Sequence, residues 1–105
     1  MDEEIRYKLL KILENSPDLS QRDLSKSLGI SLGKVNYCLN ALKEKGLIKA
    51  RTFKNHSNKK GYLYILTPKG LEEKGKVTAR FLQSKVRELE VLKSEIEQIR
   101  SDLKQ

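Results

Sequence analysis

Residues 20–50 of the chain read SQRDLSKSLGISLGKVNYCLNALKEKGLIKA. Ser20, with Asp23 three residues later, resembles a capping box and predicts a short helix over about residues 21–28. Gly29 can supply a left-handed turn residue, and Ser31 is a good N-cap for a further helix that ends at Gly46. This stretch therefore predicts two helices joined by a tight glycine turn.

The residues before this stretch predict one more helix. Ile5, Leu9, Ile12 and Leu13 recur at helical spacing after an acidic opening, which indicates a helix over about residues 3–15. Asn15-Ser16-Pro17 ends it. The chain thus begins with three successive helices.

After Gly46 the hydrophobic period changes from helical to two. Residues 48–53 and 62–66 alternate as strands do, and the polar residues 54–61 between them predict a hairpin with a long basic tip. Thr67-Pro68 then starts a helix that could run to Gln105. Gly70 and Gly75 weaken its beginning, which allows a kink or break near them.

This order of elements predicts a mainly α fold with a small β-hairpin wing, a winged helix-turn-helix followed by a long C-terminal helix. The expected division is a winged helix-turn-helix DNA-binding domain over residues 1–69 and a C-terminal helix over residues 70–105. A chain of 105 residues has the length of one such compact unit.

Composition limits the compartment and the partner. Cys38 is the single cysteine, and the opening Met1-Asp2-Glu3-Glu4 is unlike a secretory leader, so a reducing cytoplasm is expected. Cys38 itself is expected to be a packed thiol, with a redox sensor as the alternative. The formal charge of +8 favours an anionic partner, with nucleic acid first. No nucleophile, base and acid come together, so no enzyme and no cofactor are expected.

The third helix carries the predicted contacts with bases. Its apolar residues Leu32, Val35, Leu39 and Leu42 are expected to pack on one face. The candidates for DNA contact on the remaining surface are Ser31, Gly33, Lys34, Asn36, Tyr37 and Asn40. Lys34 suits guanine or phosphate, the two asparagines suit adenine, and Tyr37 suits a phosphate or a thymine methyl. A partly buried Tyr37 ring and a merely exposed Asn40 are the alternatives.

The hairpin and its flanks supply the expected electrostatic grip. Residues 49–69 contain six Lys or Arg and no Asp or Glu. A basic run is often only a solvated surface, but on a wing it can follow the DNA backbone into a minor groove. The candidate residues of the wing and flanks are Ser20, Gln21, Lys49, Arg51, Lys54, Asn55, His56, Asn58, Lys59 and Lys60.

The C-terminal segment predicts a coiled-coil seam. Its residues at a and d positions, interrupted by Lys85, are Leu82, Leu89, Leu92, Ile96, Ile99 and Leu103. A parallel pair places Glu88 opposite Lys93 of a second copy and Glu95 opposite Arg100. A homodimer is therefore expected, while the alternative is that this stripe covers the chain's own first helix.

Three segments resemble the MarR type of bacterial transcriptional regulator: LSKSLGIS at residues 24–31, LNALKEKGLIK at residues 39–49 and LTPKG at residues 66–70. The short length, the opening residues 2–10 and the coiled tail are similar to a subgroup associated with extracellular polysaccharide loci. The resemblance implies a dimer on a palindromic operator of double-stranded DNA, controlling neighbouring genes that include those for exopolysaccharide. A winged-helix adaptor that binds an acidic protein partner is the alternative from another class.

Overall fold

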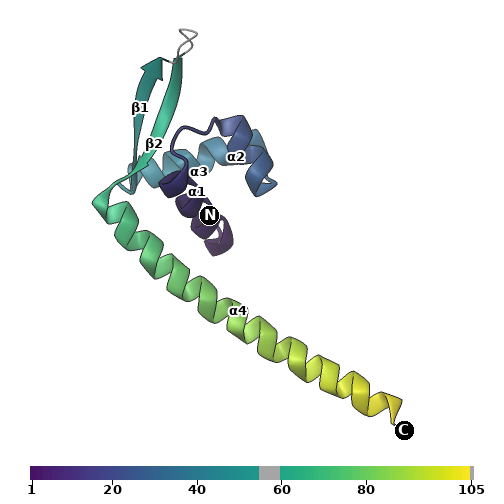
Figure 1. Cartoon of the computed structure of the whole chain (residues 1–105). Helices are drawn as coiled ribbons and strands as arrows, with labels where there is room; N and C mark the ends of the chain where they lie inside the picture. Colours follow the sequence, from purple (N-terminus) through teal and green to yellow (C-terminus); the bar gives the residue numbers. More distant parts are fainter. Residues whose placement is uncertain (55–59, 105) are drawn as a thin grey trace.

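The computed structural model describes residues 1–54 and 60–104, with the backbone alone at Lys60. The elements are α1 (Glu3–Asn15), α2 (Gln21–Leu28), α3 (Leu32–Glu44), β1 (Ile48–Lys54), β2 (Lys60–Leu66) and α4 (Pro68–Leu103). Figure 1 shows α1, α2 and α3 gathered at the root of the hairpin, from which α4 leaves as one long rod. The predicted winged-helix fold with a long C-terminal helix is confirmed.

Local signals set the ends of the first three helices. The Ser20 hydroxyl accepts a hydrogen bond from the Asp23 backbone N–H, and the Asp23 carboxylate accepts one from the Ser20 N–H. Ser31 caps α3 in the same way, by accepting from the Lys34 N–H. Gly29 ends α2 with a φ of 67°, a conformation that costs glycine little. The predicted caps and turn are therefore all present.

One hydrophobic core joins the three helices and the base of the wing. Its buried members are Leu9, Leu10, Leu13, Leu24, Val35, Cys38, Leu39, Leu42, Leu47, Ile48 and Tyr64. The prediction that Leu32 packs with them was wrong, because this side chain is 44% exposed. The buried arc of α3 runs from Leu39 to Cys38, and at about 100° per residue Leu32 falls just outside it, on the first turn of the helix.

The wing is a two-stranded antiparallel hairpin. Ile48 lies opposite Leu66 and Ala50 opposite Tyr64, so these four residues share the face that meets the helices. The strands extend to Lys54 and from Lys60, one to two residues further toward the tip than the sequence predicts. Pairing of Phe53 with Gly61, whose missing side chain leaves room for the aromatic ring, supports that extension.

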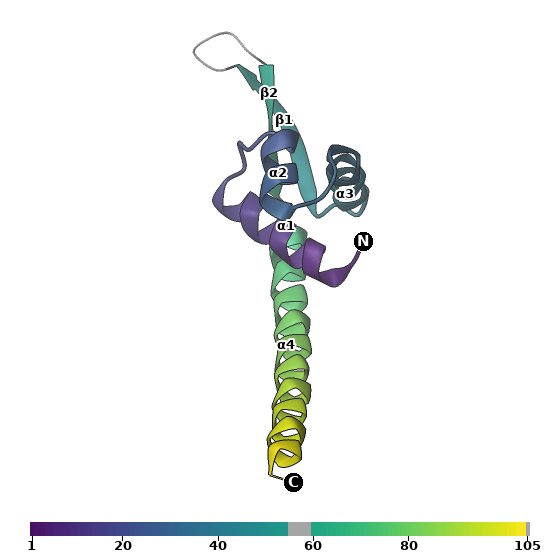
Figure 2. The same cartoon turned by 90° about the vertical axis from the view of Figure 1, so that its right-hand side faces the viewer.

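Helix α4 is continuous from Pro68 to Leu103, without the break that Gly70 and Gly75 allow near its beginning. A Cβ atom at Gly70 would overlap the Leu47 carbonyl oxygen, so glycine allows the helix to begin in contact with the chain that leads into β1. Thr67 completes this junction, because its hydroxyl accepts from the Gly70 N–H and donates to the Gly46 carbonyl at 2.6 Å. In Figure 2 the wing and α4 extend in opposite directions from the group formed by α1, α2 and α3.

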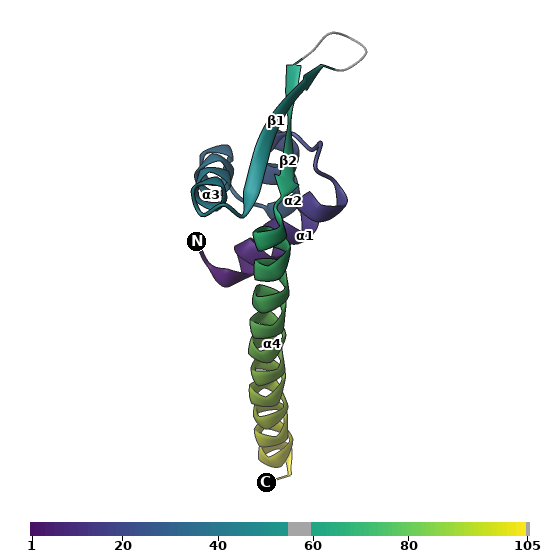
Figure 3. The same ribbon diagram turned by 90° about the vertical axis from the view of Figure 1, so that its left-hand side faces the viewer.

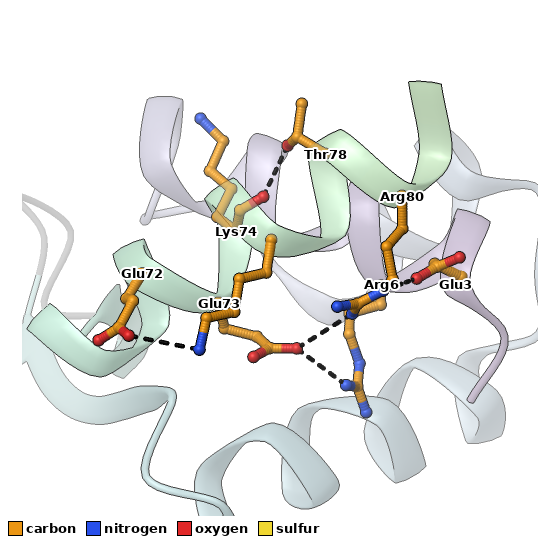
Figure 4. Close-up of polar contacts among 8 residues, drawn as sticks. Glu3, Arg6, Glu72, Glu73, Lys74, Thr78 and Arg80 are labelled. Atoms are coloured by element: carbon orange, nitrogen blue, oxygen red, sulfur yellow. Dashed lines mark hydrogen bonds and ion pairs between the residues drawn. The ribbon is translucent and has the colours of Figure 1, made fainter. Parts of the chain in front are cut away.

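The first third of α4 packs along α1. Val77 is fully buried, and the Phe81 ring stacks on Tyr7 with 4.7 Å between centroids. The ion pairs between the two helices, drawn in part in Figure 4, are Arg6–Glu73, Arg80–Glu3 and Lys74–Glu14. Within α4, Arg80 also pairs with Glu73. These contacts come before the predicted seam. Its six residues, from Leu82 to Leu103, are exposed in the chain, so the stripe itself does not cover α1.

Residues 85–104 are all exposed, and Figure 3 shows this end of α4 projecting away from the rest of the chain. The whole molecule is correspondingly elongated, with extents of 69 × 27 × 21 Å. The division after residue 69 stays a prediction, since residues 73–81 pack against α1.

The two glycines of α4 give a matched test of the junction. We expect Gly70→Ala to destabilise the protein by roughly 1–3 kcal/mol, because the new methyl group overlaps the Leu47 carbonyl. Gly75→Ala is the control, since nothing lies within 4 Å of a Cβ atom there. It should stabilise the protein by up to about 1 kcal/mol through helix propensity. Urea unfolding measures both, and a stabilised Gly70→Ala variant would contradict the packing.

Candidate nucleic-acid interface

The outer face of α3 is polar and exposed. Gly33, Lys34, Asn36, Tyr37 and Asn40 are all classed as exposed, whereas Val35, Cys38, Leu39 and Leu42 on the inner face are buried. Tyr37 is 64% exposed, which excludes the alternative of a partly buried ring. The helix thus presents a side-chain surface of the kind that reads base edges in a major groove.

Side-chain amides on this face form a chain of hydrogen bonds, here called the amide ladder (Asn40, Asn36, Gln21 and Tyr64). Asn40 Nδ2 donates to Asn36 Oδ1 at 3.2 Å, and Asn36 Nδ2 donates to Gln21 Oε1 at 3.4 Å. Gln21 Nε2 in turn donates to the Tyr64 hydroxyl at 3.1 Å. The ladder connects α3 with the start of α2 and with β2.

The two helix N-termini differ in what they offer a phosphate. Asp23 sits in the first turn of α2 and closes its cap, so a negative charge already occupies that end. The first turn of α3 holds no acidic residue, while Lys34 lies within it. Phosphate binding is therefore electrostatically favoured at Ser31 over Ser20.

The strands of the wing carry exposed cations on the solvent side. Lys49 and Arg51 pair with Ile65 and Leu63 across the hairpin, on the face opposite the core, and Lys54 ends β1. The candidate residues Asn55, His56, Asn58 and Lys59 lie outside the described residues, as does the side chain of Lys60. Contacts of this part of the wing with DNA stay a prediction.

Lys69 belongs to the same basic run but has a structural task. Its ammonium group donates to the Lys45 carbonyl at 3.0 Å, at the C-terminal end of α3. A cation there stabilises the helix by interacting with its last carbonyls. Lys69 thus helps to fix the end of the helix that carries the candidate base contacts.

A hollow of about 220 Å³ separates α3 from the inner face of the wing. Its lining residues are Gln21, Asn36, Leu39, Asn40, Lys43, Ala50, Tyr62 and Tyr64. Lys43, Tyr62 and Tyr64 are not among the residues that the sequence predicts for this interface. The alternation of β2 places the two tyrosines on one face of the hairpin, but only the packing of the hairpin on α3 shows which face meets the helix.

Cys38 is the packed thiol that the sequence predicts. It is fully buried on the inner face of α3, and burial raises the pKa of its thiol above the usual value. The nearby Lys34 opposes this shift without reversing it. A neutral, inaccessible thiol is a poor nucleophile and does not favour the redox alternative.

The six residues of the predicted seam are exposed. The exposed fractions of their side chains range from 40% at Ile96 to 82% at Leu103. Val86 and Val91 are exposed on the same helix, at 46% and 58%. Apolar exposure of this extent on one helix marks a surface that a partner could cover. None of the described helices is both long and apolar enough to cross a lipid bilayer.

Together, the helix-turn-helix of α2 and α3 and the adjoining wing define a winged helix-turn-helix fold, with the polar outer face of α3 exposed beside the wing. Residues 2–49 match the family model described as "Winged helix-turn-helix DNA-binding". No curated protein matches the chain.

Solved structures of bacterial regulators share this fold. A PadR-like transcriptional regulator from Bacillus cereus aligns with a TM-score of 0.68 and 21% identity, over 80% of this chain and 88% of that one. A MarR family protein from Mycobacterium tuberculosis, in complex with salicylic acid, aligns with a TM-score of 0.63 and 20% identity, over 79% of this chain and 60% of that one. FabT from Streptococcus pneumoniae, in complex with DNA, aligns with a TM-score of 0.57 and 25% identity, over 80% of this chain and 57% of that one. The chain thus spans most of the first protein but less than two thirds of the other two.

The burial of Cys38 predicts how its thiol reacts. In the native protein we expect slow modification by a disulfide reagent at pH 8, because reaction requires opening of the core. Urea should make the reaction fast, and a Gln83→Cys variant supplies an exposed thiol for comparison. Because the folded pKa is raised, ionisation of the unfolded thiol should lower stability as the pH rises above about 8.5. Rapid native labelling at Cys38 would contradict this assignment.

Proposed function

We propose that this chain is a dimeric, sequence-specific regulator of transcription that binds double-stranded DNA. The observation that carries the proposal is the outer face of α3, where Lys34 and Tyr37 are exposed and have no hydrogen-bond or ion-pair partner among the described residues. A surface built only for stability needs no such side chains next to the N-terminus of a helix. In a major groove they meet phosphates and base edges.

The wing complements this helix electrostatically. Lys49, Arg51 and Lys54 are exposed on β1, and no acidic residue lies in the strand to neutralise them. Cations beside a groove-binding helix fix its register on the backbone, whereas the helix itself supplies the sequence preference. In this arrangement the cations of the wing supply affinity for any duplex, which weakens as the salt concentration rises. The outer face of α3 supplies the preference for a particular sequence.

The distal part of α4 is proposed to pair with a second copy in parallel. Its exposed a and d residues supply the apolar seam, and both g to e′ pairs, Glu88 with Lys93 and Glu95 with Arg100, are attractive in that orientation. In the single chain Arg100 pairs with Glu97 and Glu88 with Lys85, three residues away, at exposed sites. Exposed ion pairs of this kind contribute little, so exchanging them for pairs between chains is inexpensive in free energy.

A dimer of this kind would bind a palindromic operator with its half-sites about 34 Å apart or a multiple of that distance. We assign it to MarR-like regulators and place exopolysaccharide genes among its targets. The support for both is the resemblance carried by residues 24–31, 39–49 and 66–70 and by the coiled tail.

The DNA-binding proposal predicts the behaviour of a double variant. Duplexes enriched by the wild-type chain from a random library provide the probe, and fluorescence anisotropy gives the affinity. Lys34→Ala combined with Tyr37→Ala should lower affinity for the enriched duplex at least about tenfold, since each good base contact contributes roughly 1–3 kcal/mol. Lys76→Ala, an exposed lysine on α4 beyond the wing, is the control and should bind as the wild type does.

The salt dependence provides the second readout of the same experiment. If each subunit neutralises about four phosphates, the logarithm of affinity should fall with the logarithm of salt with a slope near −7 for the dimer. A flat salt response, or no enriched sequence, would overturn the proposal and would favour a winged-helix adaptor for an acidic protein instead.

The dimer proposal predicts a difference between two positions on α4. Leu92→Glu with Ile96→Glu places charges in the seam and should give a monomer in sedimentation, at concentrations where the wild type is dimeric. Val91→Glu is the matched control, because Val91 is exposed, at 58% against 52% for Leu92 and 40% for Ile96, but lies off the seam. It should remain dimeric. A monomeric wild type, or a dimeric seam variant, would contradict the proposal.

Leu103→Cys distinguishes the parallel from the antiparallel arrangement. In a parallel pair the two new thiols face each other near the C-termini, within reach of a disulfide. Cys38 is buried and does not compete. We expect oxidation to link the chains covalently, whereas an antiparallel pair would leave them unlinked.

A further inference from the structure

The amide ladder runs in one direction. Each nitrogen along it donates to the oxygen of the next side chain, from Asn40 through Asn36 and Gln21 to the Tyr64 hydroxyl. The three bonds connect three elements, α3, α2 and β2, and the bond from Gln21 to Tyr64 joins residues 43 positions apart in the sequence. A chain of this kind relates the orientation of one amide to that of the next, because a flipped amide would place two donors or two acceptors face to face.

The Tyr64 end of the ladder is anchored. Tyr64 is 7% exposed within the hydrophobic core, and its backbone N–H donates to the Pro17 carbonyl at 2.9 Å. Its ring stacks on Tyr62 with 6.1 Å between centroids. Gln21 is the first residue of α2, held by the Ser20 and Asp23 capping box. The ladder therefore begins at a fixed hydroxyl and a fixed helix end.

The ladder restricts what Asn36 can do. Its carbonyl oxygen accepts from Asn40 and one N–H of its amide donates to Gln21, so both the oxygen and the nitrogen already have a partner within the protein. Direct reading of a base by Asn36 would require these bonds to break or to be shared. Asn36 thus serves as a link between Gln21 and Asn40.

Asn40 lies at the open end. One N–H of its amide is given to Asn36, which leaves one N–H and the carbonyl oxygen, and no described residue donates to that oxygen. One donor and one acceptor on the same amide are what the major-groove edge of adenine takes, through N7 and the N6 amino group. Because Asn36 presents an oxygen, Asn40 must turn its nitrogen toward it and its own oxygen away.

We propose that Gln21 and the Tyr64 hydroxyl are positioning residues that hold Asn40 in the orientation for reading adenine. This role rests on the proposed function, and it requires no contact between a base and either Gln21 or Tyr64. Pre-orienting the amide removes an ordering cost that binding would otherwise bear. The wing therefore contributes to specificity through Tyr64, at its base, and to affinity through the cations of β1.

Tyr64→Phe tests this with the smallest change available. It removes the hydroxyl and keeps the ring in the core. On the duplex enriched by the wild-type chain, affinity should fall about fivefold, the size of one hydrogen bond. Affinity for an unrelated duplex of equal length, and the salt slope, should stay unchanged. Tyr62→Phe is the matched control, since it removes a neighbouring tyrosine hydroxyl that is not part of the ladder. Its ratio of specific to nonspecific affinity should equal that of the wild type.

Gln21→Met breaks the ladder from α2 at a half-exposed site and should cause a similar loss, so the test does not depend on tolerance of Tyr64→Phe by the core. Asn40→Ala should relax the preference for adenine at one position of the selected site. Adding Tyr64→Phe to Asn40→Ala should cause no further loss, because the residue being positioned is already missing.

The outcomes separate the two proposals. If the wild-type chain enriches no sequence, the DNA-reading function itself fails. If it enriches a sequence and Tyr64→Phe keeps the wild-type ratio, or if the losses of Tyr64→Phe and Asn40→Ala add, the positioning role is overturned while the function stands. Thermal unfolding of each variant, followed by circular dichroism, shows that the compared proteins are folded.

Discussion

The architecture depends on burial of one narrow arc of α3. Val35, Cys38, Leu39 and Leu42 are nearly or completely inaccessible, and they hold the helix against α1, α2 and the base of the wing. Since a helix has a fixed angular relation between its faces, burial of this arc determines which residues look outward. The polar face with Lys34, Tyr37 and Asn40 is a consequence of that packing.

The second constraint is the close approach at Gly70, which starts α4 against the Leu47 carbonyl. From there α4 packs along α1 through Val77 and the Tyr7–Phe81 stack, and the ion pairs Arg6–Glu73 and Lys74–Glu14 connect the same two helices. The hydrogen bond to Glu3 raises the pKa of Arg80 above its usual value. The rod beyond Phe81 therefore leaves the winged domain at a defined angle.

Sequence reasoning succeeded where the signal is local. Ser20 with Asp23, Gly29, Ser31 and Thr67-Pro68 each act within a few residues, and the helix ends they predict are present. It failed where a distant element decides. The positions of α1 and α2 decide that Cys38, and not Leu32, completes the buried arc of α3. The role of Gly70 likewise depends on the carbonyl of Leu47, 23 residues earlier in the chain. Tyr64 could be placed on a strand face, but its partner Gln21 lies 43 residues away and no local pattern connects them.

In the proposed dimer, these features would make the distance between two recognition helices a property of α4. The helix has no break from Pro68 to Leu103, and a continuous helix resists bending because each turn is held by its backbone hydrogen bonds. The seam would fix the two rods relative to each other, and the α1 contact fixes each winged domain relative to its rod. The spacing of half-sites is then set far from the DNA, whereas the reading of each half-site is set by α3 and the amide ladder. Because the two tasks use different residues, changes in the seam and changes on α3 should have separable effects on spacing and on base preference.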